Sequence, residues 1–333
     1  MITTKDYVVS ELIKSDDYIS GEALSSKLGI SRAAINSAVK ALRLEGYDIE
    51  SSTRKGYSLK SNPDVLSVGE MLAYLPAERL DKVIVLDETD STNKVLKDMG
   101  SDGAPEGTIV IADCQLKGRG RLGRSFLSPH GKGIYFSYLV RPTSRIDEIS
   151  TITAWTAVAI SNAINNVFGV KPDIKWVNDL LINKKKICGI LTELSLETES
   201  GHIDNIVIGI GINVNHTPED FPEELRDIAS SISFESKKHE SRSKLASEMV
   251  KEMDKLVERW ADGKEIYLNQ YRENCINIGR DVACVNIHGE GNPRPGKAIG
   301  INDDFSIRIE FEDGSVENLS SGEVSVRGLY GYV

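Results

Sequence analysis

The spacing of apolar and polar residues divides the chain into a helical beginning, a mixed middle and a strand-rich end. In the first 46 residues, apolar side chains recur at helical intervals in three runs, which begin after Thr3, Ser20 and Ser31. Serine and threonine cap helix N-termini because their side chains accept hydrogen bonds from first-turn amides. The pattern therefore predicts three helices, the second ended by Gly29 and the third by Gly46.

The third predicted helix is amphipathic and precedes a predicted hairpin. Its outer face repeats polar and basic side chains, which are Arg32, Asn36, Lys40 and Arg43. Behind it, alternating segments at 47–49 and 57–59 predict a β-hairpin with Arg54 and Lys55 at its tip. A polar helix face by itself is also typical of a solvated helix, but the order of all four elements resembles the winged helix-turn-helix.

This resemblance implies a DNA-binding module at residues 1–62. The third helix would enter a major groove and the hairpin tip would meet phosphates. The residues expected to contact DNA are Ser31, Arg32, Asn36, Lys40, Arg54 and Lys55. Residues 1–60 hold nine Lys or Arg against eight Asp or Glu, a net charge of about +1, whereas the rest of the chain carries about −11. Because so small a charge attracts DNA weakly, we expect a homodimer on an operator with two half-sites.

From residue 81 the pattern changes to strands that alternate with helices. The apolar runs predict strands at 82–86, 108–112, 133–140 and 206–215, and helices near 93 and at 149–168, 218–227 and 242–274. Residues 63–80, before this region, are predicted to be a linker with a short helix. Residues 275–333 contain short alternating runs separated by Asn, Asp and Gly turns, which predicts a small barrel.

A basic, glycine-rich loop stands between two of these strands. Residues 117–126 hold four cations in a chain whose formal net charge is −10. Glycines let backbone amides approach a ligand, and guanidinium groups bind phosphate or carboxylate through paired hydrogen bonds. The loop therefore predicts an anion-binding site, with a solvated disordered loop as the alternative. A strand follows it, which excludes a dinucleotide-binding fingerprint, and no downstream His-Arg-Asp motif supports a kinase loop.

Further polar groups lie on a second predicted hairpin and before the first helix of the middle region. The Asn183-Lys184 pair between apolar runs predicts a tight turn, so Lys175 and Lys186 are expected on strands that can face each other. The polar residues 90–93 are expected to cap the following helix. On the residues alone, each group is also compatible with an ordinary solvated or capping role.

Composition limits the environment that the chain is expected to occupy. No window approaches 18 uncharged apolar residues, and the first six residues do not begin a secretory signal, so neither membrane insertion nor export is expected. The four cysteines are dispersed without a Cys-x-x-Cys pair, which favours reduced thiols in the cytoplasm over a structural zinc site. We expect Cys114 and Cys188 to be buried apolar groups.

Five motifs, in order, resemble those of the biotin protein ligase family. They are Gly118–Arg124, Lys175–Asp179, Lys186–Glu193, Gly209–Asn213 and Ser321–Ser325. With the N-terminal module, the chain resembles the bifunctional bacterial form, in which a biotin-[acetyl-CoA-carboxylase] ligase is also the biotin operon repressor. The resemblance implies an α+β multidomain fold. It places a winged helix-turn-helix at 1–62, a linker at 63–80, a class II aminoacyl-tRNA synthetase-like α/β ligase domain at 81–274 and an SH3-like β-barrel at 275–333.

The resemblance also implies a two-step reaction. Biotin and ATP, accompanied by Mg²⁺, would form biotinyl-5′-AMP, and a lysine of biotin carboxyl carrier protein of acetyl-CoA carboxylase would then accept the biotin. Bound biotinyl-AMP would favour the homodimer on operator DNA and so repress genes of biotin synthesis and transport. No general base is required, because the attacking carboxylate is already ionised.

Matching positions imply a role for each site residue. The catalytic cations are Arg119, Arg121, Lys175 and Lys186. Contacts with biotin or its adenylate are assigned to Ser91, Thr92, Asn93, Gln115, Arg119, Gly120, Arg121, Lys186 and Gly189. ATP and its adenine are assigned to Arg124, Asn178, Asp179 and Asn213, with Asp179 also the expected magnesium ligand. The chain has Val177 where the family usually has Pro, and Phe126 where it usually has Trp, which bears on how the basic loop covers the adenylate.

Two other functions remain open at this point. A lipoate ligase would share the middle region but leaves residues 1–60 unexplained, and testing lipoate or octanoate as substrate separates the two. A transcription factor that only senses a ligand would bind DNA without releasing diphosphate. The basic loop and the two lysine motifs argue against a pure sensor, because it needs no clamp for an α-phosphate.

Overall fold

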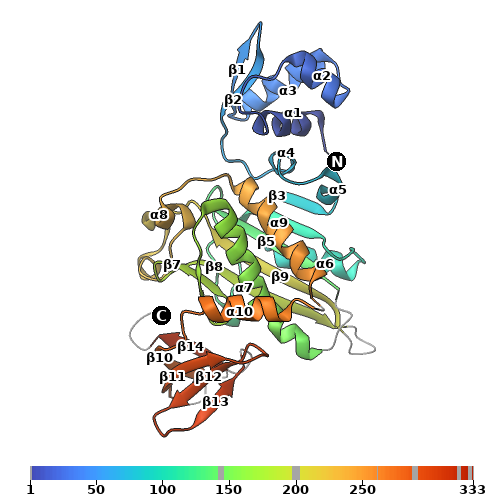
Figure 1. The fold of residues 1–333 in the computed structure, drawn as a ribbon. Helices are drawn as coiled ribbons and strands as arrows, with labels where there is room; N and C mark the ends of the chain where they lie inside the picture. The colour runs from blue at the N-terminus through green and yellow to red at the C-terminus, as the bar shows by residue number, and fades with distance from the viewer. Residues whose placement is uncertain are drawn as a thin grey trace.

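The computed structural model describes residues 2–141, 146–196, 203–260, 262–286, 292–320, 324–328 and 332. A small N-terminal module stands at one end, a central α/β body follows, and a C-terminal sheet lies at the other end (Figure 1). Within the described residues, no helix has both the length and the apolar character needed to cross a membrane. The first three residues of the Ser321–Ser325 motif lie outside the described residues.

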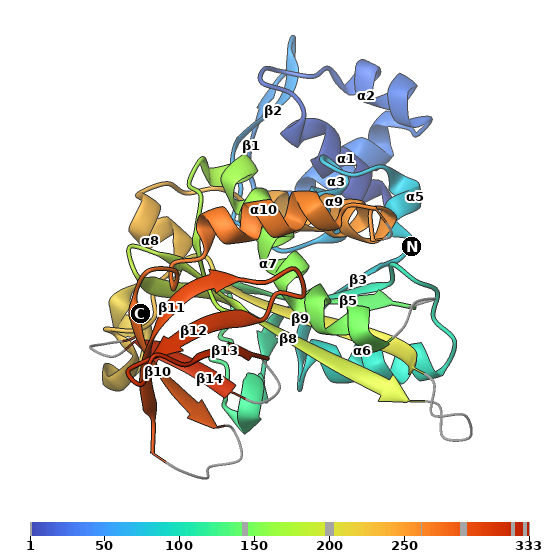
Figure 2. The ribbon, with the colours of Figure 1, turned by 60° about the horizontal axis from the view of Figure 1, so that its bottom comes forward.

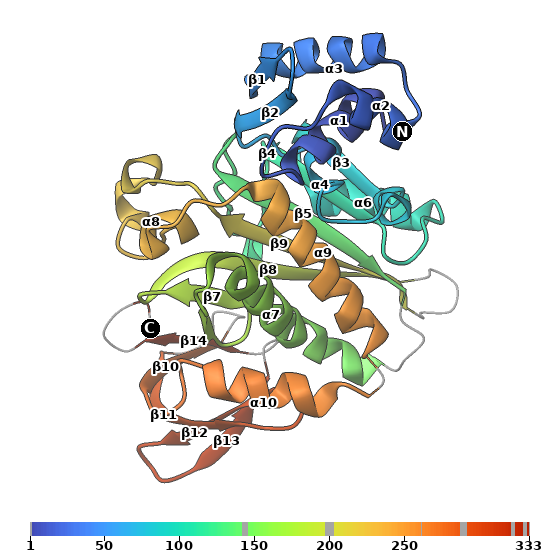
Figure 3. The same cartoon turned by 45° about the horizontal axis from the view of Figure 1, so that its top comes forward.

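The N-terminal module forms the predicted winged helix-turn-helix. Its elements are α1 (Thr4–Ile13), α2 (Gly21–Leu28), α3 (Arg32–Leu44), β1 (Asp48–Ser52) and β2 (Gly56–Ser61). The three predicted caps are confirmed, since Thr3, Ser20 and Ser31 each accept a hydrogen bond from a first-turn amide. A separate apolar core, which includes Leu24 and Ile35, holds the module together. In Figure 3, α3 lies on the side of the module away from the central sheet.

The central body is a seven-stranded mixed sheet covered on both faces. Its spatial order is β3 (Val83–Thr89), β4 (Ile109–Gln115), β5 (Gly133–Val140), β9 (Ile203–Asn213), β8 (Lys185–Leu196), β7 (Asp179–Ile182) and β6 (Asp173–Lys175). Only the β3 and β4 pair is parallel among these neighbours. Helices α7 (Ile146–Phe168) and α9 (Arg242–Glu258) pack on one face and α6 (Thr92–Ser101) on the other (Figure 3).

The C-terminal strands form a five-stranded antiparallel sheet that fits the predicted barrel-like domain. Its spatial order is β13 (Val316–Leu319), β12 (Ile307–Phe311), β11 (Arg294–Ile301), β10 (Asp281–Asn286) and β14 (Val324–Gly328). Helix α10 (Lys264–Asn274) lies against it (Figure 2), and Trp176 Nε1 donates a hydrogen bond to the Phe305 carbonyl at 2.9 Å. This sheet therefore shares its core with the central body.

Several predicted elements differ in the structure. The helix expected at 218–227 is instead two single 3-10 turns, η2 (Pro218–Asp220) and η3 (Glu223–Leu225), because Pro222 lacks the amide that would continue a helix. The chain over 242–274 forms two helices, α9 and α10, which are separated near Gly263. Short helices that the pattern did not predict are α5 (Ala77–Leu80) and α8 (Ile232–Ser236), while the linker helix α4 (Val68–Met71) is confirmed.

A buried arginine joins the linker to the central body. Arg242, at the start of α9, is 3% exposed and forms ion pairs with Asp64 of the linker and Asp113 of β4. It also donates to the carbonyls of Gly133 at 3.0 Å and Asp64 at 2.8 Å. Arg242 thus connects three segments that are distant in sequence.

A buried carboxyl group connects the N-terminal module to the same region. Glu70 of α4 is fully buried and accepts hydrogen bonds from the Tyr47 hydroxyl at 2.9 Å and the Ser241 hydroxyl at 3.2 Å. Burial raises the pKa of Glu70 to about 7, although both hydrogen bonds oppose the shift. The module is therefore held to the body by polar contacts as well as apolar ones.

The Arg242 contacts predict a large effect on stability. An Arg242→Met change leaves two carboxylates without their buried partner, so it should lower the free energy of unfolding by about 3–5 kcal/mol. The three tryptophans lie in or beside the central body, so their fluorescence during urea unfolding reports its midpoint. Lys251→Met on the same helix, which breaks a partly exposed ion pair with Glu248, should cost less than about 1 kcal/mol. Equal midpoints for the two variants would contradict this assignment.

Candidate active site

The basic loop folds into a small hairpin between β4 and β5. Phe126 N donates to the Gly118 carbonyl at 2.9 Å, and Gly120 N donates to the Arg124 carbonyl at 2.7 Å. Between them, a single 3-10 turn, η1 (Arg121–Gly123), carries the tip. These bonds give the loop's cations defined directions.

The loop covers a cavity of about 690 Å³ at the ends of the central strands. The residues predicted for the site that line it are Ser91, Thr92, Asn93, Gln115, Arg119, Gly120, Arg121, Arg124, Lys175, Asn178, Asp179, Lys186 and Gly189. Asn213 is not among the lining residues. It is buried, and its side-chain amide instead donates to the Ser230 carbonyl at 3.0 Å.

One end of the cavity is a network of amide and hydroxyl groups. The Gln115 side-chain oxygen accepts from Thr92 N at 2.9 Å, so Gln115 takes the capping role at α6 that was expected of the 90–93 cluster. Ser91 occupies the N-cap position but forms no side-chain capping bond. The Ser137 hydroxyl lies 2.6 Å from Asn93 Oδ1, and Asn93 Nδ2 donates to Glu193 at 2.7 Å. The amide groups at this end are thus held in fixed orientations.

The other end concentrates positive charge around one carboxylate. Lys186 Nζ lies 2.7 Å from Asp179 Oδ1, and the Tyr332 hydroxyl donates to Asp179 Oδ2. Burial by itself would raise the pKa of Asp179, but the charge of Lys186 and the Tyr332 hydrogen bond outweigh it and hold the pKa below its ordinary value. Lys175, which is 6% exposed, places Nζ 3.3 Å from the centre of the Tyr332 ring.

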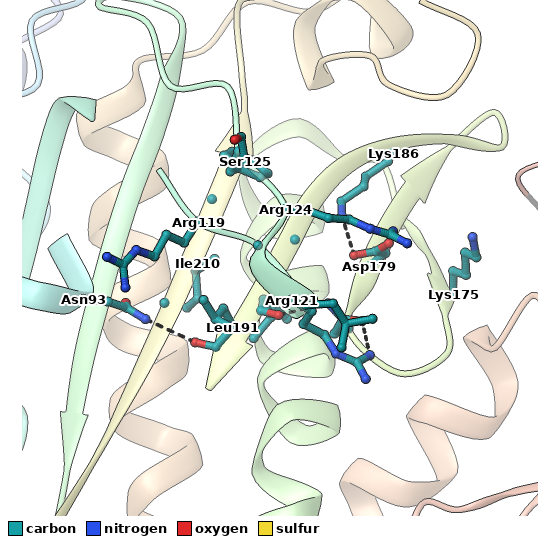
Figure 4. A pocket seen from close by; sticks show the side chains of 18 of the residues that line it. Asn93, Arg119, Arg121, Arg124, Ser125, Lys175, Asp179, Lys186, Leu191 and Ile210 are labelled. Carbon is teal, nitrogen blue, oxygen red and sulfur yellow. Dashed lines mark hydrogen bonds and ion pairs between the residues drawn. The ribbon is translucent and has the colours of Figure 1, made fainter. Parts of the chain in front are cut away.

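The cations come from separate elements and line one cavity. Arg119 lies near Asn93, whereas Lys186, Asp179 and Lys175 lie on the far side of Arg121 (Figure 4). Arg121 donates to Asn178 Oδ1 at 3.0 Å, and burial lowers the pKa of its guanidinium.

Lys175 and Lys186 are not on paired strands. The prediction that their strands face each other is wrong, because β7 lies between β6 and β8. The tight turn at Asn183 and Lys184 is confirmed, with both residues at positive φ. The intervening strand begins at Asp179, so it places the carboxylate between the two lysines.

Glycines on β9 let side chains from other elements lie against the strand backbone. A Cβ added at Gly211 would lie 2.6 Å from Phe126 Cε1, and one added at Gly209 would collide with Asn93. Phe126 also contacts Tyr135 edge-on, with ring centroids 6.4 Å apart. The Phe126 ring therefore anchors the C-terminal side of the basic loop to the cavity floor.

Some lining residues were not identified from the sequence. They are Leu122, Ser125, Phe136, Trp176, Ile190, Leu191, Ile210, Asp227, Ile228, Val326 and Tyr332. Val326 and Tyr332 come from the C-terminal region, more than 100 residues after Lys186, and no local pattern marks them. Ile228 is placed by a backbone bond from Lys186 N at 2.8 Å.

The predicted DNA-contacting residues gather on the exposed surface of the N-terminal module. Ser31, Arg32, Asn36 and Lys40 are exposed on α3, and Arg54 and Lys55 are exposed at the hairpin tip. Arg32 pairs with Glu22 at 2.8 Å, which offsets part of the positive charge of this face.

Comparison with known proteins agrees with both parts of this description. Residues 85–213 match the biotin/lipoate A/B protein ligase family, and residues 4–58 match the helix-turn-helix domain family. A bifunctional ligase/repressor from Bacillus subtilis is 34% identical over 93% of this chain and 94% of its own length. The Escherichia coli bifunctional ligase/repressor is 30% identical, with 95% of each chain covered.

A solved structure supports the same fold for most of the chain. The biotin protein ligase from Aquifex aeolicus in complex with biotin and ATP superimposes with a TM-score of 0.63 and 31% identity, covering 74% of this chain and 98% of that one. The fold and cavity thus define the class as a protein ligase that carries a helix-turn-helix module. The chain belongs to the family of bifunctional biotin protein ligase/repressors.

The contact between Phe126 and β9 generates a test of loop anchoring. A Gly211→Ala change should displace the Phe126 ring and loosen residues 117–126, because the new methyl group occupies the ring's position. Trypsin should then cleave after Arg119, Arg121 or Arg124 several-fold faster, as measured by mass spectrometry. Gly300→Ala is the matched control, since its added Cβ meets no atom within 4 Å. Equal cleavage rates in the two variants would show that Phe126 does not hold the loop.

Proposed function

We propose that this protein activates biotin with ATP to form biotinyl-5′-AMP and transfers the biotin to a lysine of biotin carboxyl carrier protein. The observation that carries this proposal is a single cavity with a network of amide and hydroxyl groups at one end and clustered cations at the other. One end suits an uncharged ring, and the other suits a carboxylate meeting a phosphate.

The end with the amide and hydroxyl groups suits the ureido ring of biotin. That ring has two N–H donors and one carbonyl acceptor, and Thr92, Asn93 and Gln115 offer fixed donors and acceptors of the same kind. The biotin or adenylate contacts proposed here are Ser91, Thr92, Asn93, Gln115, Arg119, Gly120, Arg121, Lys186 and Gly189. Apolar side chains such as Ile190 and Phe126 line the space between the two ends.

The cationic end suits the activation step. The biotin carboxylate oxygen attacks the α-phosphorus of ATP, and diphosphate leaves. At about 4 Å and an effective dielectric near 20, each pair of like charges repels by roughly 4 kcal/mol. Arg119, Arg121, Lys175 and Lys186 offset this repulsion, and they also stabilise the negative charge of the transition state.

Asp179 is suited to hold magnesium beside the nucleotide. Lys186 Nζ, 2.7 Å from Oδ1, and the Tyr332 hydroxyl keep Asp179 ionised at the edge of the cavity, and an ionised carboxylate can serve as a magnesium ligand. Mg²⁺ is usually bound by one or two carboxylates together with substrate phosphates, and when bound it would neutralise phosphate charge. Arg124, Asn178 and Asp179 are the proposed ATP residues, and Asn213, at the end of β9, is the proposed residue near the adenine.

In the second step, the carrier lysine amine attacks the acyl carbon of the adenylate and AMP leaves. The basic loop covers the cavity, so it can exclude water from the mixed anhydride until the carrier arrives. The glycines of the loop let it open for the carrier lysine, and Phe126 anchors the loop while it covers the cavity.

We further propose that the protein is a cytoplasmic, biotin-responsive repressor of biotin synthesis and transport genes. Biotinyl-AMP would favour a homodimer, which binds two operator half-sites through α3 and the hairpin tip. The corresponding division of the chain is a DNA-binding domain at 1–62, a linker at 63–80, a ligase domain at 81–274 and a C-terminal domain at 275–333.

Two neighbouring lysines provide a direct test of the ligase function. Purified protein given biotin, ATP, Mg²⁺ and the carrier domain should biotinylate one carrier lysine. Lys186→Gln should lower kcat for adenylate formation about 100-fold or more, because it removes a donor to the transition state. Lys184→Gln, at an exposed turn position two residues away, should leave kcat unchanged. Transfer of octanoate or lipoate in place of biotin would instead identify a lipoate ligase, and no acyl transfer with DNA binding intact would indicate a pure sensor.

The DNA-binding proposal predicts a change in salt dependence. With biotin and ATP present, the protein should select a two-half-site operator from a random duplex library. Lys40→Gln should weaken DNA binding. If Lys40 neutralises one phosphate, the magnitude of the slope of log affinity against log salt concentration should fall by about 1. Lys5→Gln on α1, whose lysine pairs with Glu45, should leave the slope unchanged. Identical slopes for both variants would remove Lys40 from the interface.

A further inference from the structure

Outside the cavity, a thiol, an imidazole and a carboxylate converge near the ends of β3 and β4. Glu88 and Cys114 are register partners on these parallel strands, and His130 comes from the segment between the basic loop and β5. One ligand atom from each residue lies within 4.8 Å of the other two. Sulfur, nitrogen and oxygen donors that come this close form the kind of ligand set that binds zinc and related divalent transition metals.

The imidazole of His130 has the orientation of a metal ligand. Its Nδ1 lies 3.2 Å from Asp113 Oδ2, and its Nε2 lies 3.4 Å from Glu88 Oε2. Asp113 is itself held by Gly131 N at 3.1 Å and by the buried Arg242. When Nδ1–H is donated to Asp113, the lone pair of Nε2 faces the Glu88 carboxylate. A carboxylate that orients a histidine in this way is a regular feature of zinc sites.

Charge and access also favour a cation at this position. Asp87 lies 3.9 Å from His130 Nδ1 and adds a further carboxylate. Arg242 pairs with Asp113 and Asp64, so the charges of Asp87 and Glu88 are not neutralised by it. Cys114 is 7% exposed and forms the floor, whereas the Glu88 and His130 side chains are about half exposed. An ion can therefore enter from solvent and keep a water ligand.

We propose that Glu88, Cys114 and His130 bind a divalent transition-metal ion of the zinc class. On binding, the Cys114 thiol releases its proton to solvent and the thiolate sulfur donates an electron pair to the metal. The ion would link Cys114, before the basic loop, to His130, after it. Two of the proposed ligands are close in sequence to residues that already bond to each other across this segment. Cys114 directly precedes Gln115, and His130 follows Ser128 by two residues. Gln115 Nε2 donates to the Ser128 hydroxyl at 3.2 Å.

The competing state of this cluster contains a proton in place of a metal. The hydrogen bond with Asp113, followed by that with Glu88, raises the pKa of His130, so an imidazolium can bridge the two carboxylates without any metal. The protonated, metal-free cluster contains no bond between the Cys114 sulfur and a metal. An absorption band of such a bond therefore distinguishes the metal-bound cluster from the protonated one.

Cobalt titration tests the proposal. Untagged full-length protein is freed of metal with a chelator and titrated with Co²⁺ in the absence of biotin and nucleotide. It should bind one equivalent with a near-ultraviolet absorption of thiolate-to-cobalt charge transfer, and Zn²⁺ should displace it. Cys114→Ser should abolish this absorption, and His130→Asn or Glu88→Gln should weaken Co²⁺ binding about tenfold or more. Cys284→Ser and His239→Asn are the matched controls and should behave as the unaltered protein.

The outcomes decide the assignment. Failure of the unaltered protein to bind Co²⁺ would overturn it and leave the proton-bridged state. Binding without the sulfur band, or binding that Cys114→Ser and His130→Asn leave unchanged, would place the ion elsewhere and would equally overturn it. Circular dichroism checks the folding of each variant. If Cys114→Ser does not fold, alkylation of Cys114 by iodoacetamide decides, since Zn²⁺ should slow it in the unaltered protein but not in His130→Asn.

Discussion

Buried positive charge is the constraint on which the site depends. Lys175, which is buried, and Lys186, which is partly buried, reach the same space from β6 and β8, and two such cations repel each other unless an acid lies nearby. Asp179, at the start of the strand between them, supplies that acid and remains ionised. An anionic substrate that enters the cavity can therefore pair with these lysines in place of part of the Asp179 charge. The lysines are then positioned to bind phosphate.

The floor of the cavity depends on the absence of side chains. Gly209 and Gly211 alternate along β9 on the face that meets Asn93 and Phe126, and neither position has room for a Cβ beside those groups. The strand thus supports the amide network at one end and the basic loop at its centre. Phe126 packs its ring against the strand at Gly211.

Polar contacts link the site to the DNA-binding module. Asp113 lies two residues before Gln115 on β4, and it is bound by Arg242, which also binds Asp64 in the linker. Beside this junction, Glu70 joins Tyr47 of the module to Ser241 in front of α9. These contacts join β4, the linker and the N-terminal module in one connected set of polar groups, in which Arg242, Glu70 and Tyr47 are buried.

The sequence by itself determined the elements whose signals are local. Caps and periodicity identified α1 to α3, and turn chemistry identified the hairpin at Asn183 and Lys184, because neighbouring residues form those structures. The resemblance likewise named about half of the residues that line the cavity. Only the tertiary structure decided that β7 separates the two lysines, that Tyr332 reaches Asp179, and that Glu88, Cys114 and His130 meet. Those contacts depend on strand order and chain return, which bring together residues with no short-range relation in the sequence.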